Sequence, residues 1–215
     1  MFVPRQYHEP EGSWMVDLIA SNPMALAATN GSVAGGPFAT HLPVIFDPDA
    51  PDDYADNLSG TRLLGHMNRA NPHWKALKNG DPVLLVFTGP HGYVSPTVYA
   101  TSPAAPTWDF TAVHAHGTVE RIESTEATLD VIKSTVTALE GKFGANWDMS
   151  ESVDYFHKIV PAVGAFRVTV SAAEGMFKLS QEQPAEVRDR VQCAFSERES
   201  GRYGELAALM GRLTG

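Results

Sequence analysis

The sequence is poor in cysteine and in basic residues, and it lacks any long apolar segment. Its one cysteine, Cys193, excludes an internal disulfide framework and fits a reducing compartment. We expect this residue to be a small, buried or semi-buried apolar side chain. The formal charge of −9 would repel a phosphate backbone, so nucleic-acid binding is not expected. With neither a membrane-spanning segment nor a signal peptide, the sequence predicts a cytoplasmic protein.

Several familiar site signatures are also missing. The sequence contains no Gly-x-Gly-x-x-Gly, no Walker loop, no cysteine pair and no serine in a nucleophile elbow. His114 and His116 could share one face of a strand, but no third ligand has suitable spacing, so no metal site is expected. The aspartate-rich segment 47–56 has no calcium-loop spacing, and we expect a solvated loop there.

The length of 215 residues and the hydrophobic content of 43% suit one core, or a barrel with an attached helical layer. Short strands dominate the first half and helices the second, which predicts an α+β fold built on an antiparallel barrel with peripheral helices. We expect the barrel domain to cover residues 1–195 and a helical tail, loosely attached, to cover 196–215.

Hydrophobic periodicity and turn residues predict the individual elements. Strands are expected at residues 24–29, 38–46, 61–66, 82–88, 93–99, 108–122 and 164–173. Helices are expected at residues 14–20, 72–77, 125–140, 151–158, 184–194 and 205–213.

Clusters of His, Asn, Trp and Ser-Pro lie at the predicted strand ends. They are Thr40–Pro43, Gly65–Trp74, Gly89–Pro96 and Pro106–Phe110. Polar and aromatic groups concentrated at strand ends favour a ligand site, because a core rejects them and a bare surface rarely gathers them.

These clusters, together with the opening Met1–Tyr7 and the late Phe177–Gln181, resemble the PaiB family of FMN-binding proteins, described as negative transcriptional regulators. The resemblance runs from Met1 to about Arg190. It implies a flavin-binding split β-barrel, related to the pyridoxamine-phosphate-oxidase-like flavoproteins, that works as a homodimer with FMN at the subunit interface.

The resemblance also suggests which side chains hold the flavin. His66, Arg69 and Asn71 match the segment that binds the phosphate, although Arg69 and Asn71 could instead only cap the helix entered at Pro72. The strand residues Thr40, His41 and Leu42 would lie beside the ring. His41 could equally be a satisfied core residue.

Further candidates come from the later clusters. Ser95, Thr97 and Tyr99 alternate on a predicted strand, which would place three hydroxyls on one face. Lys178, Ser180 and Gln181 match the family's Lys-Leu-Ser-Gln element. Trp108 and Asp109 stand in a segment that reads Thr-Trp-Asn-Tyr in the family, so Asp109 replaces an amide by a group that only accepts when ionised. A tryptophan and a lysine of the family pattern are missing around residues 97–102.

These observations favour an FMN-dependent oxidoreductase acting on a small organic substrate. His41 and His114 are the candidates for proton transfer, with Tyr99 and Asp109 orienting the substrate. Two alternatives stay open at this point. The protein could be a flavin-binding regulator without turnover, or the barrel could bind haem through histidine ligands.

Overall fold

The computed structural model describes residues 1–33, 36–51, 54, 57–145, 147–198 and 202–213. The contacts divide the chain into two compact units. The barrel unit comprises Ile19–Phe87 and His114–Ala173, and the terminal unit comprises Met1–Leu18, Thr88–Val113 and Glu174–Gly215. Among the described helices, none combines the length and the apolar character needed to span a membrane. The cytoplasmic location stays a prediction.

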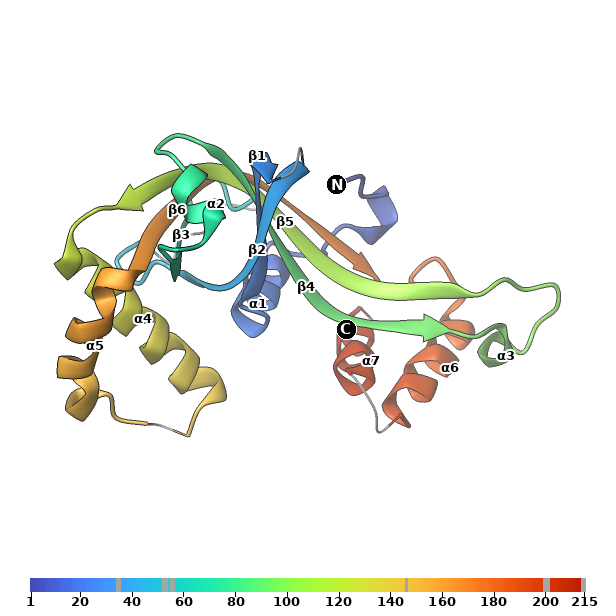
Figure 1. The fold of residues 1–215 in the computed structure, drawn as a ribbon. Coiled ribbons are helices and arrows are strands. Elements are labelled where there is room, and N and C mark those ends of the chain that lie inside the picture. Colours follow the sequence, from blue (N-terminus) through green and yellow to red (C-terminus); the bar gives the residue numbers. More distant parts are fainter. Residues whose placement is uncertain (34–35, 52–53, 55–56, 146, 199–201, 214–215) are drawn as a thin grey trace. The chain divides into compact units, whose positions relative to one another are not determined.

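Six antiparallel strands close into a barrel in the order β1-β2-β3-β6-β5-β4 (Figure 1). The strands are β1 (Met24–Val33), β2 (Gly36–Phe46), β3 (Arg62–Asn68), β4 (Pro82–Val94), β5 (Thr107–Ile122) and β6 (Val163–Lys178). Strands β4, β5 and β6 are long enough to contribute residues to both units. The predicted α+β fold with an antiparallel barrel is thereby confirmed.

Alternation of side chains along the strands builds the barrel core. Ala25 and Ala27 of β1, Leu85 of β4 and Val168 of β6 are all buried, with at most 2% of their surface exposed. Leu63 of β3 is opposite Val168 in the register and is also fully buried. Small alanines from β1 face larger aliphatic side chains, which lets the interior of a narrow barrel fill without voids.

Two helices cover part of the barrel unit. Helix α4 (Thr125–Phe143) begins at Ser124, whose side chain accepts a hydrogen bond from Ala127 N, as expected for an N-cap. Its Val131 packs against Ile45 and Leu64 of the strands. The other side of α4 packs against Phe156 of α5 (Val153–Ile159). The short 3-10 helices η2 (Ser150–Ser152) and η3 (Val160–Ala162) flank α5.

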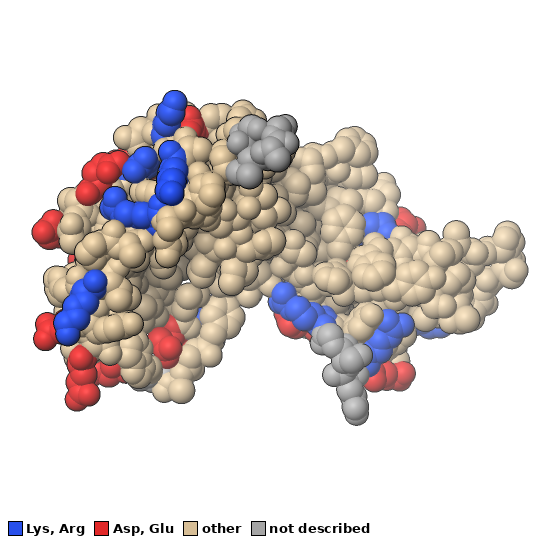
Figure 2. Space-filling view, viewed as in Figure 1, with Lys and Arg blue, Asp and Glu red and all other residues tan. Residues whose placement is uncertain are grey.

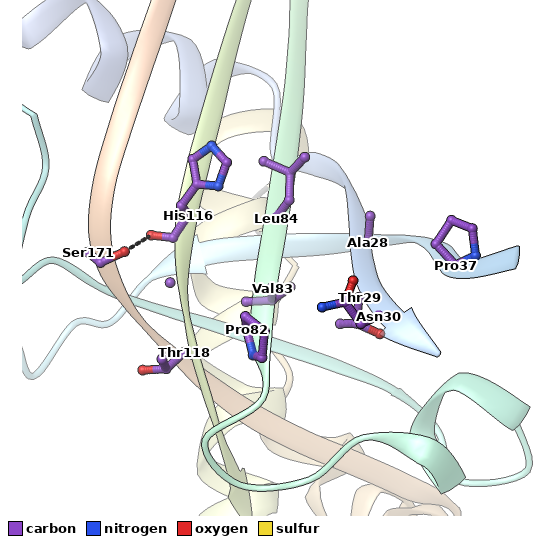
Figure 3. A pocket seen from close by; sticks show the side chains of 11 residues that line it. Ala28, Thr29, Asn30, Pro37, Pro82, Val83, Leu84, His116, Thr118 and Ser171 are labelled. Atoms are coloured by element: carbon purple, nitrogen blue, oxygen red, sulfur yellow. Dashed lines mark hydrogen bonds between the residues drawn. The ribbon is translucent and has the colours of Figure 1, made fainter. Parts of the chain in front are cut away.

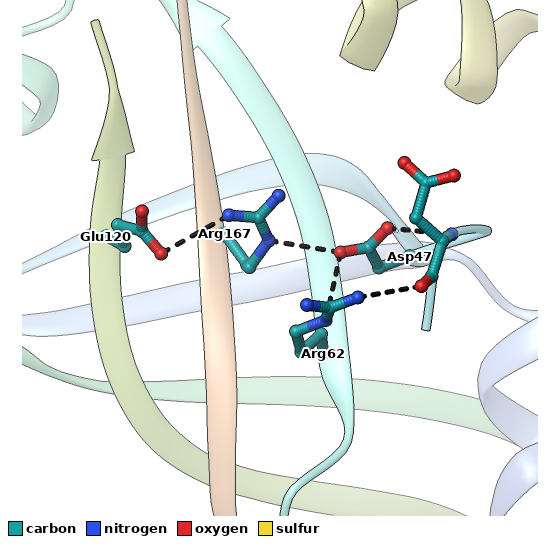
Figure 4. Close-up of polar contacts among 5 residues, drawn as sticks. Asp47, Arg62, Glu120 and Arg167 are labelled. Carbon is teal, nitrogen blue, oxygen red and sulfur yellow. Dashed lines mark hydrogen bonds and ion pairs between the residues drawn. The ribbon is translucent and has the colours of Figure 1, made fainter. Parts of the chain in front are cut away.

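An ion-pair network around the buried Asp47 links four segments of the barrel unit (Figure 4). Asp47 is 4% exposed, and its Oδ2 lies 3.2 Å from Arg62 Nε and 3.0 Å from Arg167 Nε. Its Oδ1 accepts a hydrogen bond from Asp49 N, and Arg167 also bonds Glu120. The prediction that the whole segment 47–56 is solvated was therefore wrong at Asp47; residues 52, 53, 55 and 56 lie outside the described residues.

Helices α1 (Ser13–Ser21), α6 (Ala185–Ser196) and α7 (Tyr203–Arg212) are the longer helices of the termini, and η1 (Arg5–Tyr7) is a short 3-10 helix there. Trp14 packs edge-on against Phe177 at 5.3 Å between ring centroids. Leu206 and Met210 of α7 are fully buried. The last helix is therefore packed by its apolar face and is not a loose tail. Cys193 is exposed on α6, contrary to the expectation of burial, because it lies on the helix face opposite Val191 and Phe195.

Two further expectations were wrong. The predicted strands 82–88 and 93–99 are replaced by one strand, β4, that runs through Gly89–Gly92 to Val94. After it the chain forms helix α3 (Pro96–Tyr99), with Ser95 as N-cap and Pro96 at the first position. The hydroxyls of Ser95, Thr97 and Tyr99 therefore do not alternate on a strand face. Helix α2 (Pro72–Ala76), by contrast, begins at the predicted proline.

Candidate functional site

A buried group of ionisable and hydroxyl side chains lies in the terminal unit, where β5 begins and β6 ends. Asp109 has no exposed surface. Its Oδ2 accepts a hydrogen bond of 2.6 Å from Ser180 Oγ, and Lys178 Nζ lies 3.8 Å from its Oδ1. We call Asp109, Lys178 and Ser180 the Asp109 cluster. It brings together two segments that the sequence had selected separately.

The lysine of this cluster does not fully satisfy the carboxylate. Lys178 Nζ donates to Thr107 Oγ1 and, at 3.1 Å, to the carbonyl of Trp108. Its distance of 3.8 Å to Asp109 Oδ1 is too long for a hydrogen bond. Among the described residues, no donor reaches that buried Oδ1. One carboxylate oxygen is therefore buried without a hydrogen bond, which is costly when the group is ionised.

The electrostatic consequence is a weakened acid. Burial raises the pKa of Asp109 from 3.8 to about 6, although the Ser180 hydrogen bond and the Lys178 charge act in the opposite direction. Near neutral pH the carboxyl group can therefore both hold and release a proton. Burial, with a smaller contribution from the Asp109 charge, also raises the pKa of Tyr99. Tyr7 of η1 behaves in the same way, because burial raises its pKa too.

The turn after β6 sets the position of Ser180. Ser180 has a φ of 57°, in the left-handed region that non-glycine residues rarely adopt. Gln181 holds this turn, since its Oε1 accepts a hydrogen bond from Leu179 N and its Nε2 donates to the carbonyl of Phe177. Of the three predicted residues, Lys178 and Ser180 therefore join Asp109, whereas Gln181 braces the backbone.

A second buried polar group lies in the barrel unit, at the start of α2. His73 is 2% exposed, and its Nδ1 and Nε2 lie 2.9 Å from the hydroxyls of Thr40 and Thr29, respectively. Asn71 Oδ1 accepts a hydrogen bond from His73 N, and Asn71 Nδ2 donates to Thr40 Oγ1 at 3.3 Å. Phe38 stacks on the imidazole at 5.2 Å. We call Thr29, Thr40, Asn71 and His73 the His73 network.

The helix cap fixes the direction of the hydrogen bonds that Asn71 makes in this network. Because the Oδ1 of Asn71 accepts from the backbone, its amide nitrogen must be the donor to Thr40. The hydroxyl of Thr40 therefore accepts from Asn71 and also lies within hydrogen-bond distance of His73 Nδ1, while Thr29 lies at the same distance from Nε2. Burial lowers the pKa of His73, which favours the neutral form of the ring. Asn71 is thus the N-cap of α2, as one of the two sequence hypotheses had it.

Basic residues gather next to this network. Figure 2 shows Lys and Arg side chains at the upper left, over α2. The guanidinium of Arg121 lies 4.4 Å from the centroid of the Trp74 ring and that of Arg69 lies 5.7 Å from it. Arg69 Nε donates to the carbonyl of Val163 at 2.7 Å. Lys75 and Lys78 are exposed nearby. This basic surface suits a phosphate group.

A pocket of about 420 Å³ opens on the outside of the barrel unit (Figure 3). Its walls are largely apolar, with Ala28, Pro37, Pro82, Val83 and Leu84 among them. Polar side chains at its edge include Asn30, Thr118 and Ser171, and the Ser171 hydroxyl donates to the carbonyl of His116. An apolar wall with a few polar groups at its rim suits a flat organic ring.

The other sequence candidates are dispersed. His41 is exposed on β2, Leu42 is buried in the barrel, and His114 is half-buried on β5. Ser95 and Thr97 bond each other through their hydroxyls at the start of α3. Trp108 is 49% exposed, and its side chain alternates with that of buried Asp109 along β5. His66 is half-buried, burial lowers its pKa, and its Nδ1 has no hydrogen-bond donor or acceptor near it among the described residues.

Comparison with known proteins identifies the family. Residues 1–172 match the family model described as "Putative FMN-binding domain". The chain belongs to this family. The resemblance to PaiB and the expectation of FMN are thereby confirmed at the level of the family.

Relatives of similar length support this assignment. The chain is 25% identical over 187 residues to "Protease synthase and sporulation protein PAI 2" of Bacillus subtilis, covering 84% of this chain and 82% of the relative. It is 28% identical over 228 residues to protein AN0679 of Emericella nidulans, covering 91% and 90%. Each match spans most of both chains, so the similarity concerns the whole architecture.

Solved structures share the fold. The FAD and heme binding protein of Mycobacterium smegmatis aligns with a TM-score of 0.57 at 17% identity, covering 85% of this chain and 78% of that chain. The flavocytochrome Anf3 of Azotobacter vinelandii aligns with a TM-score of 0.55 at 16% identity, covering 81% and 72%. At such low identity these likenesses concern the fold alone.

The barrel unit has the types of side chain that bind the phosphate and the ring of FMN. The phosphate needs a cation with several donors, and among the described residues Arg69 makes its hydrogen bond through Nε and none through its two terminal nitrogens. The ring needs a flat apolar wall, which the pocket beside Ala28 and Leu84 has. The buried, unpaired Nδ1 of His66 is a polar atom of the kind that a ligand group can satisfy.

Sequence reasoning missed His73 and Thr29 of the His73 network, and it did not place Tyr7 beside the Asp109 cluster. His73 was within a selected segment but carried no distinguishing signal, since its partners Thr29 and Thr40 come from other strands. Tyr7 was noticed only as part of the opening motif. Its place within 6.0 Å of Lys178 depends on how the N-terminal segment folds back.

Proposed function

We propose that this protein is an FMN-dependent oxidoreductase acting on a small organic substrate. The observation that carries the proposal is the Asp109 cluster: a fully buried carboxyl group with a pKa of about 6, one unpaired oxygen and a lysine 3.8 Å away. Groups with such shifted pKa values concentrate at sites of proton transfer. When bound, FMN supplies the capacity to accept or donate hydride.

In this proposal each residue of the cluster has a separate task. Protonated Asp109 donates its proton to a substrate oxygen or nitrogen, and ionised Asp109 accepts one. Ser180 holds the carboxyl group through Oδ2, which leaves Oδ1 for the exchange. The positive charge of Lys178 stabilises the ionised form. His41 and His114 are further candidates for proton transfer, and Tyr99 for orienting the substrate.

For the cofactor, we propose that Arg69 binds the FMN phosphate. Support comes from its engagement through Nε alone, which orients the guanidinium and leaves its fork for an anion. His66 is proposed to contribute a polar ring atom to the same ligand. Asn71 and Thr40 act through the His73 network by fixing the start of α2.

We also propose a homodimer. On the outer face of the barrel, Leu26 of β1 is opposite Val86 of β4, and Ala28 is opposite Leu84. All four apolar side chains are only half-buried in the single chain. Such a row is suited to burial against a second copy. Sedimentation should give a dimer, and a Leu26→Glu variant should sediment as a monomer. A wild-type monomer at micromolar concentration would contradict this part.

Spectroscopy and turnover test the function. The purified protein, saturated with FMN, is mixed with NADH or NADPH and small acceptor molecules, and oxidation of the nicotinamide is recorded. Asp109→Asn should retain flavin absorbance but lose most of the turnover at pH 7. Asp189→Asn, which changes an exposed aspartate of α6, serves as the matched control and should behave like the wild type.

Other outcomes identify the alternatives. Flavin absorbance without turnover on any acceptor would favour a flavin-binding regulator, in line with the family resemblance. A Soret band in the purified protein would favour haem. Full turnover in Asp109→Asn would remove the proton-transfer role.

A further inference from the structure

Three exposed aromatic rings lie on one face of the paired strands β4 and β5 in the terminal unit. Tyr93 is 42% exposed, Trp108 is 49% exposed, and His91 is exposed as well. The Trp108 ring lies 5.8 Å from the His91 ring and 6.0 Å from the Tyr93 ring, measured between centroids. We call His91, Tyr93 and Trp108 the aromatic platform.

The two faces of β4 differ in how far other residues cover them. Gly92, between His91 and Tyr93, is buried, and a Cβ there would overlap the rings of Tyr203 and Phe195. Helices α6 and α7 thus cover that face with aromatic side chains. The platform face has no cover of this kind among the described residues. Large rings gathered on an uncovered face usually mark a binding surface.

Hydrogen bonding gives the platform a defined polarity. Trp108 Nε1 can only donate, and it points at His91 Nδ1 at 3.3 Å. In the neutral imidazole the proton is then on Nε2, so His91 presents a donor. The platform therefore offers ring faces for stacking together with one oriented N–H group.

Among the described residues, no lysine or arginine lies over a platform ring, although Arg198 donates to the backbone carbonyl of Tyr93 at 3.3 Å. The cation–ring contacts of the described residues involve Trp74, Tyr7, Phe195, Tyr203 and Trp14, and none involves a platform ring. Lys178 reaches the backbone carbonyl of Trp108, but its amine is engaged with Asp109 and Thr107. A ligand that needs a cation for its phosphate is therefore poorly matched to this surface.

We infer that the aromatic platform binds an uncharged, planar heteroaromatic ring that carries a carbonyl acceptor, as the nicotinamide ring does. The ring stacks on Trp108, its edge meets Tyr93, whose plane is inclined at 56° to that of Trp108, and its carbonyl accepts from His91 Nε2. This binding site is additional to the proposed function. The inference rests on the proposed function only if the bound ring is taken to exchange hydride with the flavin. The inference concerns binding and can be tested without turnover.

The test uses the indole N–H signals of the four tryptophans in the FMN-saturated protein labelled with ¹⁵N-tryptophan. Nicotinamide is titrated in, and cyclohexanecarboxamide, which has the same carboxamide but no aromatic face, is titrated as the ligand control. The Trp108 signal is assigned by its loss in Trp108→Phe. Trp147 is 48% exposed and therefore serves as a matched internal control.

Nicotinamide should shift the Trp108 signal in a saturable manner and leave the Trp147 signal in place, and cyclohexanecarboxamide should shift neither. His91→Phe, which retains a ring but lacks the donor, should weaken binding about tenfold, the size expected for a hydrogen bond of ordinary strength. Loss of the stacking face in Trp108→Leu, followed through ligand signals, should weaken it about tenfold or more.

Three results would overturn the inference. Equal shifts at Trp147, or with cyclohexanecarboxamide, would show unspecific contact. A shift seen without FMN but abolished by it would assign the platform to the flavin. If the Trp108 signal shifted with protein concentration and Trp108→Leu changed the sedimentation, the aromatic platform would be a contact with a second copy of the chain. Because none of these readouts needs catalysis, they do not depend on the proposed oxidoreductase activity.

Discussion

Two buried aspartates in this protein have opposite surroundings. Asp47 is 4% exposed and has two arginines within 3.2 Å as well as the backbone N–H of Asp49. Asp109 is fully buried but receives only one hydrogen bond, from Ser180, and its lysine stays 3.8 Å away. Burial alone therefore does not define a functional carboxylate. The one that is left partly unpaired, with a pKa raised to about 6, is the candidate for chemistry.

The largest effect is expected at the well-paired carboxylate. Asp47→Asn leaves two guanidinium groups facing a neutral amide, and it should lower the free energy of unfolding by about 2 to 4 kcal/mol. This value is below the full range for a buried pair because both arginines are partly exposed. Urea denaturation measures the change. Glu120→Gln, at the exposed end of the same network, should cost less than about 1 kcal/mol. If Asp47→Asn and Glu120→Gln lowered the free energy of unfolding equally, Asp47 would not be the central residue of this ion-pair network.

Asp109→Asn should change the free energy of unfolding in the opposite direction and stabilise the protein. A folded-state pKa raised from 3.8 to about 6 means that folding favours the protonated carboxyl, so stability from this group is lost as the pH rises through that interval. Asparagine has no such loss and can still accept from Ser180. At pH 8 the variant should be roughly 2 to 3 kcal/mol more stable than the wild type. The difference should shrink toward zero near pH 4, and denaturation at several pH values measures it.

A pH-independent difference would show that the two side chains differ in packing rather than in ionisation. A variant less stable than the wild type at pH 8 would mean that Lys178 compensates the buried charge after all.

The cofactor proposal predicts a comparable effect on binding. Arg69→Ala should weaken FMN binding by about 1.5 to 3 kcal/mol, the range for a hydrogen bond to a charged group. Quenching of FMN fluorescence on titration measures the affinity. Lys75→Ala removes an exposed charge from the same basic surface and should cost less than about 1 kcal/mol. Identical losses of FMN affinity in both variants would show that Arg69 contributes only to the general positive charge of this surface and does not bind the phosphate directly.

The smallest effect concerns the neutral His73 network. Asn71→Ala removes the cap of α2 and should destabilise the protein by about 1 kcal/mol or slightly more. Asn71→Asp retains the cap acceptor but loses the donor to Thr40, so it should cost less. Thermal denaturation of the two variants separates the roles. If Asn71→Asp is the more damaging variant, the donor to Thr40, and not the cap, is the important contact.

The sequence predicted those features whose signals are local. Proline at the start of α2, the serine cap of α4 and the alternation in the strands of the barrel all follow from neighbouring residues. Helix α3 was mistaken for a strand because Thr97 and Tyr99 alternate with apolar residues, although Ser95-Pro96 is a helix start. Cap chemistry outweighed the pattern of period two there.

The candidate site was predicted only in part, because its important features are distances between distant segments. The resemblance selected Lys178, Ser180 and Asp109. The absence of a hydrogen-bond donor to Asp109 Oδ1 among the described residues, however, follows only from the fold. The same holds for Asp47, which looked like one of several loop aspartates until Arg62 and Arg167 were placed beside it.

The most direct test of the account is the titration of Asp109 itself. The ¹³C signals of the aspartate carboxyl groups are followed from pH 3 to pH 9, and the Asp109 signal is assigned by its absence from Asp109→Asn. We predict a midpoint near 6, in agreement with burial and an unpaired oxygen. A midpoint at or below 3.8 would show that Lys178 and Ser180 fully stabilise the ionised form, and the proposed proton exchange at Asp109 would have to be abandoned.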